Sequence, residues 1–529
     1  MSNLDPKKTD IILAGPGVGK TTELLRRINN ALADGVAPDS IAFFSFSTTA
    51  VNEGLERITK TKEYLKGQFR FFRTLHSMAM FVLGYTANQV MSVSLKFKFA
   101  KEANLKLAPV SNFYNARRMP TPDDVLLDSI DNARQRNMSI RDYWVQNHIE
   151  DVSASYAEQI ADMYQKFKLA HGVIDFTDMI CLANKMEWEP PYFDFVFIDE
   201  AQDLSTQQWL FVEKLVKNTK RTVIVGDEKQ AIAGYAGADP DYFLSIKGNI
   251  YTLTQSYRVP ETIYKLARKV EKKMIKTRNV LWKPRALEEG ETVPGEIIRI
   301  HDLPLREMRI GKWLILTRTN AQLADFKDYM LRYCDDIAAA FTIDGKPPID
   351  LDIFKAINIF EVMSLDPRAS KFDFIEIEED DNKQRINQKQ TFIKMLKKFM
   401  SSSEPYTTNL DPTFMHRFSY ANWSEAFDKV PYNEKKYIMR ILPAYRKNPN
   451  IFNNVNIKLS TIHSAKGTEA DNVILLNNLT NQVYNNWEQD RETKDDELKV
   501  LFVAITRARK RLYILTSENR QHTFGELLQ

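Results

Sequence analysis

The chain contains very little cysteine. Cys181 and Cys334 are the only two cysteines among its 529 residues, which excludes a disulfide scaffold and a zinc site built from four thiolates. Long apolar runs are also missing, since none approaches the roughly 18 residues that a membrane-spanning helix needs. The apolar run Ile11–Ala14 ends at a glycine and is too short for a signal peptide. We therefore expect a cytoplasmic protein with no membrane partner, nucleoid-associated or, if viral, in the cytoplasm of the host.

Charge of one sign is not in excess. Lysine and arginine number 73 against 69 acidic residues, which leaves a net charge of +4, so any basic strip that binds a polyanion must be local. Hydrophobic residues make up 43% and charged residues 27%, and these values, close to those of globular chains, exclude wholesale disorder. At roughly 100–200 residues per domain, the length predicts three or four domains, or two large ones with insertions.

Short apolar runs, each followed by a chemically special residue, are the main structural signal. Runs of this length suit strands buried on both faces of a parallel sheet, and helix-like stretches such as residues 21–35 lie between them. The alternation predicts α/β layers whose ligands gather at the carboxyl ends of the strands. The predicted strands are Ile11–Ala14, Ile41–Phe46, Phe195–Ile198, Thr222–Val225, Trp313–Leu316, Val473–Leu476 and Arg511–Leu515.

Two helical stretches interrupt this alternation. We therefore predict an α/β protein with two parallel-sheet cores, each interrupted by a mainly helical insertion. Residues 1–84 and 175–250 would form the first core around an insertion at 85–174. Residues 251–364 and 455–529 would form the second core around a smaller insertion at 365–454.

A glycine-rich loop joins the first predicted strand to a helix. Residues 14–21 read Ala-Gly-Pro-Gly-Val-Gly-Lys-Thr and match the P-loop, in which backbone N–H groups and the positive end of a helix surround phosphate oxygens. The lysine can reach the β- and γ-phosphates, and the threonine hydroxyl can ligate Mg²⁺. A glycine-rich turn with a solvated lysine is the alternative, but the strand–loop–helix context favours nucleotide binding. The predicted nucleotide-binding residues here are Gly15, Gly17, Gly19, Lys20, Thr21 and Thr22.

Two acidic residues stand directly after the apolar run Phe195–Ile198. Asp199 is suited to hold Mg²⁺, directly or through a water molecule, and Glu200 is then placed to orient and deprotonate the water that attacks a γ-phosphate. By itself the pair reads equally well as a surface turn whose acids cap a helix. The P-loop upstream favours the hydrolytic interpretation.

A glutamine follows the next predicted strand, Thr222–Val225. Gln230 can hydrogen-bond the γ-phosphate and report its loss, and Tyr235 beyond it can stack on a base. As a bare motif this is weak, because Gly-Asp turns such as the one at residues 226–227 are common.

Seven further segments add motifs in a fixed order along the chain. The most specific is residues 461–469, Thr-Ile-His-Ser-Ala-Lys-Gly-Thr-Glu. Together with the P-loop and the acidic pair they resemble, from end to end, the UvrD/Rep/PcrA family of superfamily 1 DNA helicases. The resemblance implies that both cores are RecA-like. The segments are Phe44–Ala50, Arg73–Ser77, Asp175–Met179, Leu253–Arg258, Leu316–Gln322, Thr461–Glu469 and Leu501–Ala508.

The resemblance implies an ATP site with Mg²⁺ held by Thr21 and Asp199. Tyr257 would stack on the adenine and Glu469 would hold the ribose. Two arginines would come from the second core to meet the γ-phosphate, a role worth roughly 10³–10⁵ in rate. The alternative for Arg507 is a solvated side chain in a basic run, which we expect for Arg509, Lys510 and Arg511. The predicted catalytic residues are Glu200, Gln230, Arg258 and Arg507.

The resemblance also implies residues that touch DNA. Aromatic stacking contributes roughly 1–3 kcal/mol per base and tolerates any sequence, as a motor requires. Core packing is the alternative for Phe46, and a structural role is the alternative for His76. The predicted DNA-binding residues are Phe46, Thr48, His76 and Tyr235 in the first core and Arg318, Asn320 and His463 in the second.

Three features depart from the family. No glutamine occurs among the residues before Ala14, so adenine selectivity is not implied. Ala236 stands where the family has an arginine, and the second insertion is smaller than usual, so its regulatory roles do not carry over.

The implied function is an ATP-dependent DNA helicase that moves 3′→5′ on single-stranded DNA and unwinds duplexes. Its implied cofactors are ATP and Mg²⁺, and its partners are single-stranded DNA, single-strand–duplex junctions and proteins of a replication, repair or recombination complex. The alternative is a DNA-stimulated ATPase translocase that displaces proteins or remodels recombination intermediates with little unwinding. A nucleotide-gated scaffold with a dead site and an RNA helicase are weaker alternatives.

Overall fold

The structure is a computed structural model that describes residues 2–45, 47–60, 64–108, 121–287, 293–333, 340–365, 394–400, 422–481, 483–485, 491–516, 522–525 and 528. Backbone contacts divide the chain into two compact units. Unit 1 comprises Met1–Pro109, Met119–His301 and Ala465–Gln529, and unit 2 comprises Val110–Arg118 and Asp302–Ser464. No helix among the described residues is long and apolar enough to cross a membrane.

The strands form two six-stranded sheets, and every strand pair described is parallel. The first sheet runs in the order β3 (Phe71–Thr74), β2 (Ile41–Ser45), β4 (Phe193–Ile198), β5 (Thr219–Gly226), β1 (Thr9–Ala14) and β6 (Asn249–Leu253). The second runs in the order β7 (Glu296–Ile300), β12 (Ala508–Leu515), β11 (Ala470–Leu476), β8 (Trp313–Thr317), β10 (Ile457–Thr461) and β9 (Phe341–Ile343).

The helices flank these strands. In unit 1 they are α1 (Lys20–Ala33), α2 (Thr48–Thr59), α3 (Leu75–Leu83), α4 (Val93–Glu102), α5 (Pro122–Gln135), α6 (Ile140–Gln146), α7 (Ala154–His171), α8 (Phe176–Lys185), α9 (Thr206–Leu215), α10 (Pro240–Ser245), α11 (Glu261–Glu271) and α19 (Arg491–Ile505). In unit 2 they are α12 (Asn320–Tyr333), α13 (Asp352–Leu365), α16 (Trp423–Ala426) and α17 (Tyr432–Lys447).

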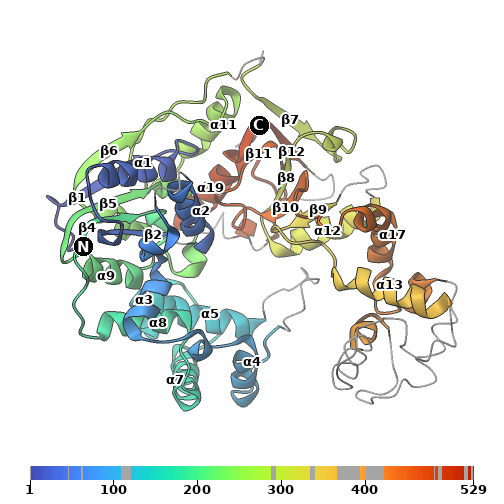
Figure 1. Cartoon of the computed structure of the whole chain (residues 1–529), viewed down its shortest axis with the longest axis horizontal. Coiled ribbons are helices and arrows are strands. Elements are labelled where there is room, and N and C mark those ends of the chain that lie inside the picture. Colours follow the sequence, from blue (N-terminus) through green and yellow to red (C-terminus); the bar gives the residue numbers. More distant parts are fainter. Residues whose placement is uncertain are drawn as a thin grey trace. The chain divides into compact units, whose positions relative to one another are not determined.

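The first sheet is buried on both faces, as the continuous apolar runs predict. Ile11 and Ile12 are both fully buried but belong to different clusters, because successive side chains of a strand point to opposite faces. One cluster packs α1 and α2 against the sheet, and the other packs α3, α8 and α9 against it. The sheet therefore lies between two layers of helices (Figure 1).

Helices α4, α5, α6 and α7 have a separate hydrophobic core that includes Phe99, Trp144 and Phe167. In Figure 1, α4 and α7 lie below α3 and α8, and α5 lies beside α8. The stretch 85–174 is thus helical in the structure, as predicted. That it is an insertion into the first core stays a prediction.

The two parallel sheets with their helices confirm the predicted α/β class and its two RecA-like cores. All seven predicted strands are present, as β1, β2, β4, β5, β8, β11 and β12. The apolar runs did not indicate β3, β6, β7, β9 and β10. In β6 four of the five residues are exposed, because it is the last strand of its sheet, and β9 has only three residues.

The predicted domain limits stay a prediction. Strand β6 pairs with β1 in the first sheet and runs across the predicted limit at residue 250. Residues 465–529 contribute β11 and β12 to the second sheet, but their backbone contacts assign them to unit 1. Residues 366–393 and 401–421, most of the predicted second insertion, lie outside the described residues.

Candidate active site

The P-loop has the backbone that phosphate binding requires. Strand β1 leads through it into α1, whose N-cap, Gly19, has a left-handed φ of 79°. Gly17 is also left-handed, with φ 68°. No side chain of the described residues caps α1, so the first N–H groups of the helix are available to an anion.

The segment 255–258 lies directly against the P-loop. The Ser256 hydroxyl donates to the Pro16 carbonyl at 2.8 Å, and the Tyr257 N–H donates to the Gly17 carbonyl at 2.8 Å. Tyr257 is 67% exposed, and its Cε2 would lie 4.0 Å from a Cβ placed on Gly19. Thr22 would lie 3.7 Å from the same point. The predicted adenine-stacking ring therefore stands beside the loop with its surface accessible.

The predicted metal ligands are brought together. Asp199 follows β4, and the Thr21 hydroxyl donates to its Oδ2 at 2.9 Å. The carboxyl is almost fully buried, and burial together with the charge of Glu200 raises the pKa of Asp199 to about 6. Buried carboxylate and hydroxyl oxygens are hard ligands, and Mg²⁺ typically takes one or two of them besides phosphate oxygens. The two residues fit that ion.

Glu200 faces two lysines. Its Oε1 lies 4.0 Å from Lys20 Nζ and its Oε2 lies 3.7 Å from Lys466 Nζ. The Gln202 amide donates to Oε2 at 2.5 Å. Burial alone would raise the pKa of Glu200, but Lys20 and Lys466 lower it to about 2. The carboxylate is therefore ionised at neutral pH and able to accept a hydrogen bond from water.

Gln230 joins two segments that are distant in sequence. It ends the 3₁₀ turn η5 (Glu228–Gln230) and is 3% exposed. Its amide nitrogen donates to Asp227 Oδ2 at 2.6 Å, and its amide oxygen accepts from Arg507 Nη2 at 2.9 Å. Burial raises the pKa of Asp227 to about 6. The predicted sensor and one predicted arginine finger are thus in direct contact.

Arg507 is not a solvated side chain. It is 1% exposed, and its Nε donates to the Val503 carbonyl at 2.9 Å. Burial, together with nearby Arg258, lowers the pKa of Arg507 to about 9, which leaves the guanidinium charged at neutral pH. Its interior position excludes the surface alternative, and its role as an arginine finger stays a prediction.

Arg258 and Glu469 are paired with each other. Arg258 Nε donates to Glu469 Oε2 at 2.5 Å, and Arg509 Nη1 donates to Oε1 at 2.7 Å. Burial alone would raise the pKa of Glu469, but the two arginines lower it. The predicted ribose ligand is thus a charged carboxylate already bound on both oxygens. Lys510 and Arg511 are exposed, as expected for a basic run, and Arg511 pairs with Glu296, whereas Arg509 is half-buried and pairs with Glu469.

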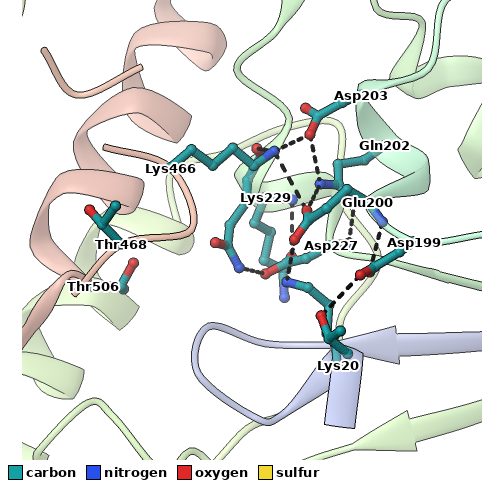
Figure 2. Close-up of polar contacts among 12 residues, drawn as sticks. Lys20, Asp199, Glu200, Gln202, Asp203, Asp227, Lys229, Lys466, Thr468 and Thr506 are labelled. Carbon is teal, nitrogen blue, oxygen red and sulfur yellow. Dashed lines mark hydrogen bonds and ion pairs between the residues drawn. The ribbon is translucent and has the colours of Figure 1, made fainter. Parts of the chain in front are cut away.

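Three polar residues that sequence reasoning did not select complete this cluster (Figure 2). Lys466 binds the Asp203 carboxylate and donates to the Gln230 carbonyl at 2.8 Å. The Gln202 amide oxygen accepts from the Asp227 N–H at 2.9 Å. Lys466 lies inside the segment Thr461–Glu469, and Gln202 and Asp203 closely follow the acidic pair, so their positions were visible in the sequence. Their partners were not, because each contact joins separate segments.

The predicted DNA-binding residues of unit 1 lie in three places. Thr48 opens α2 and is exposed, and His76 lies in the first turn of α3. These helices follow β2 and β3, so both residues lie at the carboxyl edge of the sheet, as the P-loop does. The His76 ring packs edge-on against Phe176, and burial lowers its pKa. Tyr235 is 67% exposed, and Phe46 lies outside the described residues.

The predicted DNA-binding residues of unit 2 share one edge. Arg318 and Asn320 directly follow β8, and His463 follows β10. The two strands are parallel neighbours with Thr461 opposite Thr317. The structure therefore places the three side chains at the carboxyl ends of adjacent strands.

Comparisons with known proteins agree with this arrangement. The UvrD/REP helicase N-terminal domain matches residues 2–250, and the UvrD-like helicase C-terminal domain matches residues 456–515. The chain is 24% identical to the ATP-dependent DNA helicase PcrA of Bacillus subtilis, over 99% of this chain and 84% of that protein. It is 26% identical to PcrA of Staphylococcus aureus over 59% of this chain, and 25% identical to PcrA of Leuconostoc citreum over 61%. Those two alignments span 46% of each relative. The chain belongs to the UvrD/Rep/PcrA-like superfamily 1 DNA helicases, a family of nucleoside triphosphate hydrolases.

Proposed function

We propose that this chain is an ATP-dependent helicase that moves 3′→5′ along single-stranded DNA and unwinds duplex DNA at single-strand junctions. The observation that supports this best is one polar cluster in unit 1. Lys20 of the P-loop, Glu200 after β4, Gln230 after β5 and Arg507 after α19 all take part in it. These are the groups that phosphoryl transfer to water needs.

Nucleotide binding would use the P-loop and its neighbours. The N–H groups of residues 17–20 and the ammonium of Lys20 bind the β- and γ-phosphates, and Tyr257 stacks on the base. Thr21 and Asp199 would hold Mg²⁺, which supplies positive charge to the phosphates. Glu469 has lone pairs left to accept a ribose hydroxyl, and release of its contact with Arg258 would free that arginine for the triphosphate.

Hydrolysis would depend on charged groups that are already in place. The ionised Glu200 accepts a hydrogen bond from the attacking water and aligns it. Arg507 and Arg258 stabilise the charge that develops on the γ-phosphate. Gln230 contacts Arg507 directly, so the residue that would sense the γ-phosphate is coupled to the arginine that would stabilise its charge.

DNA would be held at the same edge of the first sheet. Thr48, His76 and Tyr235 lie on loops and helix starts that follow its strands, as the P-loop and Glu200 do. Opening a duplex costs roughly 1.4 kcal/mol per base-pair step, which one hydrolysis event can supply. Protein partners of a replication, repair or recombination complex are part of the same proposal.

The test is ATP turnover with and without single-stranded DNA, followed by unwinding of tailed duplexes. Turnover should rise with DNA, a 3′-tailed duplex should be opened and a 5′-tailed one spared. The reverse polarity would remove the directional claim. Rapid displacement of streptavidin from single strands with little duplex opening would favour the translocase alternative.

A further inference from the structure

Lys229, the residue before the sensor glutamine, is a buried lysine that the proposed chemistry does not use. Its side chain is 3% exposed, and its Nζ lies 2.5 Å from Glu271 Oε1 and donates to the Val280 carbonyl at 3.2 Å. Figure 2 shows it within the group of phosphate-site side chains. Among the described residues Glu271 forms the direct ion pair with it, and Asp227 adds a longer-range attraction. A buried ammonium needs such a partner, because leaving it unpaired costs several kcal/mol.

Glu271 uses both of its oxygens. It ends α11 and is 7% exposed. Oε1 pairs with Lys229 and with Arg268 Nη1 at 2.6 Å, and Oε2 accepts from the Trp282 indole N–H at 3.2 Å. One carboxylate thus fixes the sensor turn on one side and a tryptophan on the other.

Trp282 lies against the P-loop. It is 1% exposed, and a Cβ on Gly15 would lie 2.8 Å from its Cγ. The next residue holds the segment at 254–256 in place: the Lys283 N–H donates to the Thr254 carbonyl at 2.6 Å, and its carbonyl accepts from the Ser256 N–H at 2.9 Å. Contacts therefore run without a break from the sensor turn, through Glu271 and Trp282, to the phosphate loop.

We propose that Glu271 is a positioning residue that sets Gln230 relative to the phosphate loop. The inference rests on the proposed function, in which Gln230 meets the γ-phosphate. The side-chain amide of Gln230 is fixed by hydrogen bonds with Asp227 and Arg507. The Lys229–Glu271 ion pair fixes the preceding residue, and so restrains the backbone of Gln230. A displacement of about 1 Å at such a group can cost about 10²-fold in rate.

The test is Glu271→Gln, which keeps the shape and an acceptor for the indole but removes the charge that holds Lys229. We expect kcat for DNA-stimulated turnover to fall roughly 10- to 100-fold. The Kd of a non-hydrolysable ATP analogue should stay within about threefold, because the P-loop keeps its own contacts. The matched control is Glu261→Gln on the same helix, whose exposed carboxylate pairs with Lys265 at 2.9 Å. It should change neither value.

Lys229→Met removes the other partner of the same ion pair and replaces Glu271→Gln in the test if that variant folds poorly. Combined with Glu271→Gln, it should lower kcat no further than the worse single variant, because both act on one contact. A double variant whose fold-loss of kcat equals the product of the two single losses would overturn the proposal. So would a normal kcat in the folded variants, or a parallel loss of kcat and analogue binding, which indicates general destabilisation. A wild-type chain without turnover would instead overturn the proposed function.

Discussion

Glu200 is a residue at which backbone strain and chemistry coincide. It is not a glycine, yet its φ is 52°, a conformation that costs such residues about 1–3 kcal/mol. Its N–H donates to Asp199 Oδ1 at 2.9 Å, and its carboxylate is held by Gln202. These contacts keep the carboxylate near Lys20 and Lys466 (Figure 2). We infer that the strain is tolerated because it places an ionised group beside the phosphate loop.

The residue-scale prediction that follows concerns Glu200→Gln. The amide keeps the size of the side chain but is a weaker acceptor for a water proton, so we expect turnover to fall about 10²- to 10⁴-fold. Binding of a non-hydrolysable ATP analogue should persist, because Lys20 and the loop amides remain. Measurement of phosphate release tests the predicted loss of turnover, and equilibrium binding of the analogue tests the predicted retention of affinity. A variant that hydrolyses at the wild-type rate would show that Glu200 is not the base.

Gly17 allows a second prediction at this scale. Its left-handed φ and its neighbour both oppose a side chain, since a Cβ would lie 2.5 Å from Arg258 Cβ. Gly17→Ala should therefore displace the loop or the segment at Arg258, and analogue affinity should fall at least about tenfold. The matched control is Gly67→Ala, because nothing lies within 4 Å of the added methyl group there. Equal binding by the two variants would contradict the argument.

Single residues of the site could be read from the sequence where one short segment carries the whole pattern. The P-loop and the Asp199–Glu200 pair are such segments, because strand, loop and function are contiguous. Lys466 and Asp203 could not be paired in advance, since 263 positions separate them. Their contact depends on how distant segments pack, and no local pattern encodes that.

At the scale of elements, an ionic cluster ties three helices together. Lys168 near the end of α7 is 1% exposed and contacts Asp175 and Asp178 at 2.5 Å each. Arg134 of α5 binds the same two carboxylates. Asp175 is also the N-cap of α8. The segment recognised as a family motif at residues 175–179 therefore joins the separately packed helices α5 and α7 to α8, which packs on the sheet.

This cluster predicts a loss of stability in acid. Burial alone would raise the pKa of Asp175, but Arg134 and Lys168 lower it to about 2 from its ordinary 3.8. Because the pKa is lower in the folded than in the unfolded chain, the ionised Asp175 stabilises the fold at pH values above about 3.8. This stabilisation is lost as the pH falls toward 2. The difference corresponds to about 2 kcal/mol, roughly half of it gone by pH 3.

Asp175→Asn isolates this contribution because asparagine is an equally good N-cap. The difference in unfolding free energy between wild type and variant, from urea denaturation, should shrink by about 1 kcal/mol between pH 6 and pH 3. Asp162→Asn on α7 removes an exposed partner of Lys166 and should show no such pH dependence. A pH-independent difference for Asp175→Asn would contradict the assignment.

Four of the five strands that the sequence did not indicate, β3, β6, β7 and β9, lie at the edges of their sheets, whereas β10 lies between β8 and β9. Buried strands such as β4 and β11 are continuous apolar runs because helices cover both faces. Strand β6 pairs on one side only, and its exposed Ile250 and Tyr251 sit among polar residues. Because most of its side chains are exposed, they need not be apolar, and the strand has no continuous apolar run that would indicate it in the sequence.

At the scale of the whole molecule, DNA affinity must come from a few local contacts. The net charge of +4 gives little general attraction for a polyanion. The predicted DNA-binding residues within the described parts are mostly uncharged, and Arg318 is the cation among them. The exposed Tyr235 of unit 1 offers a ring, and Arg318 of unit 2 offers a charge. The two kinds of contact differ in how they respond to salt.

This difference supports a prediction that separates stacking from charge. The affinity for single-stranded DNA should fall with salt, with a log–log slope of about −0.7 for each phosphate bound. Arg318→Ala should make the slope shallower by about 0.7. Tyr235→Ala should weaken binding by about 1–3 kcal/mol at every salt concentration and leave the slope unchanged, because stacking releases no counterions. Fluorescence anisotropy at several salt concentrations measures both, with exposed Tyr192 as the control for loss of an aromatic ring through Tyr192→Ala. An unchanged slope in Arg318→Ala would place the phosphate contact elsewhere, and a changed slope in Tyr235→Ala would show that its role is not stacking.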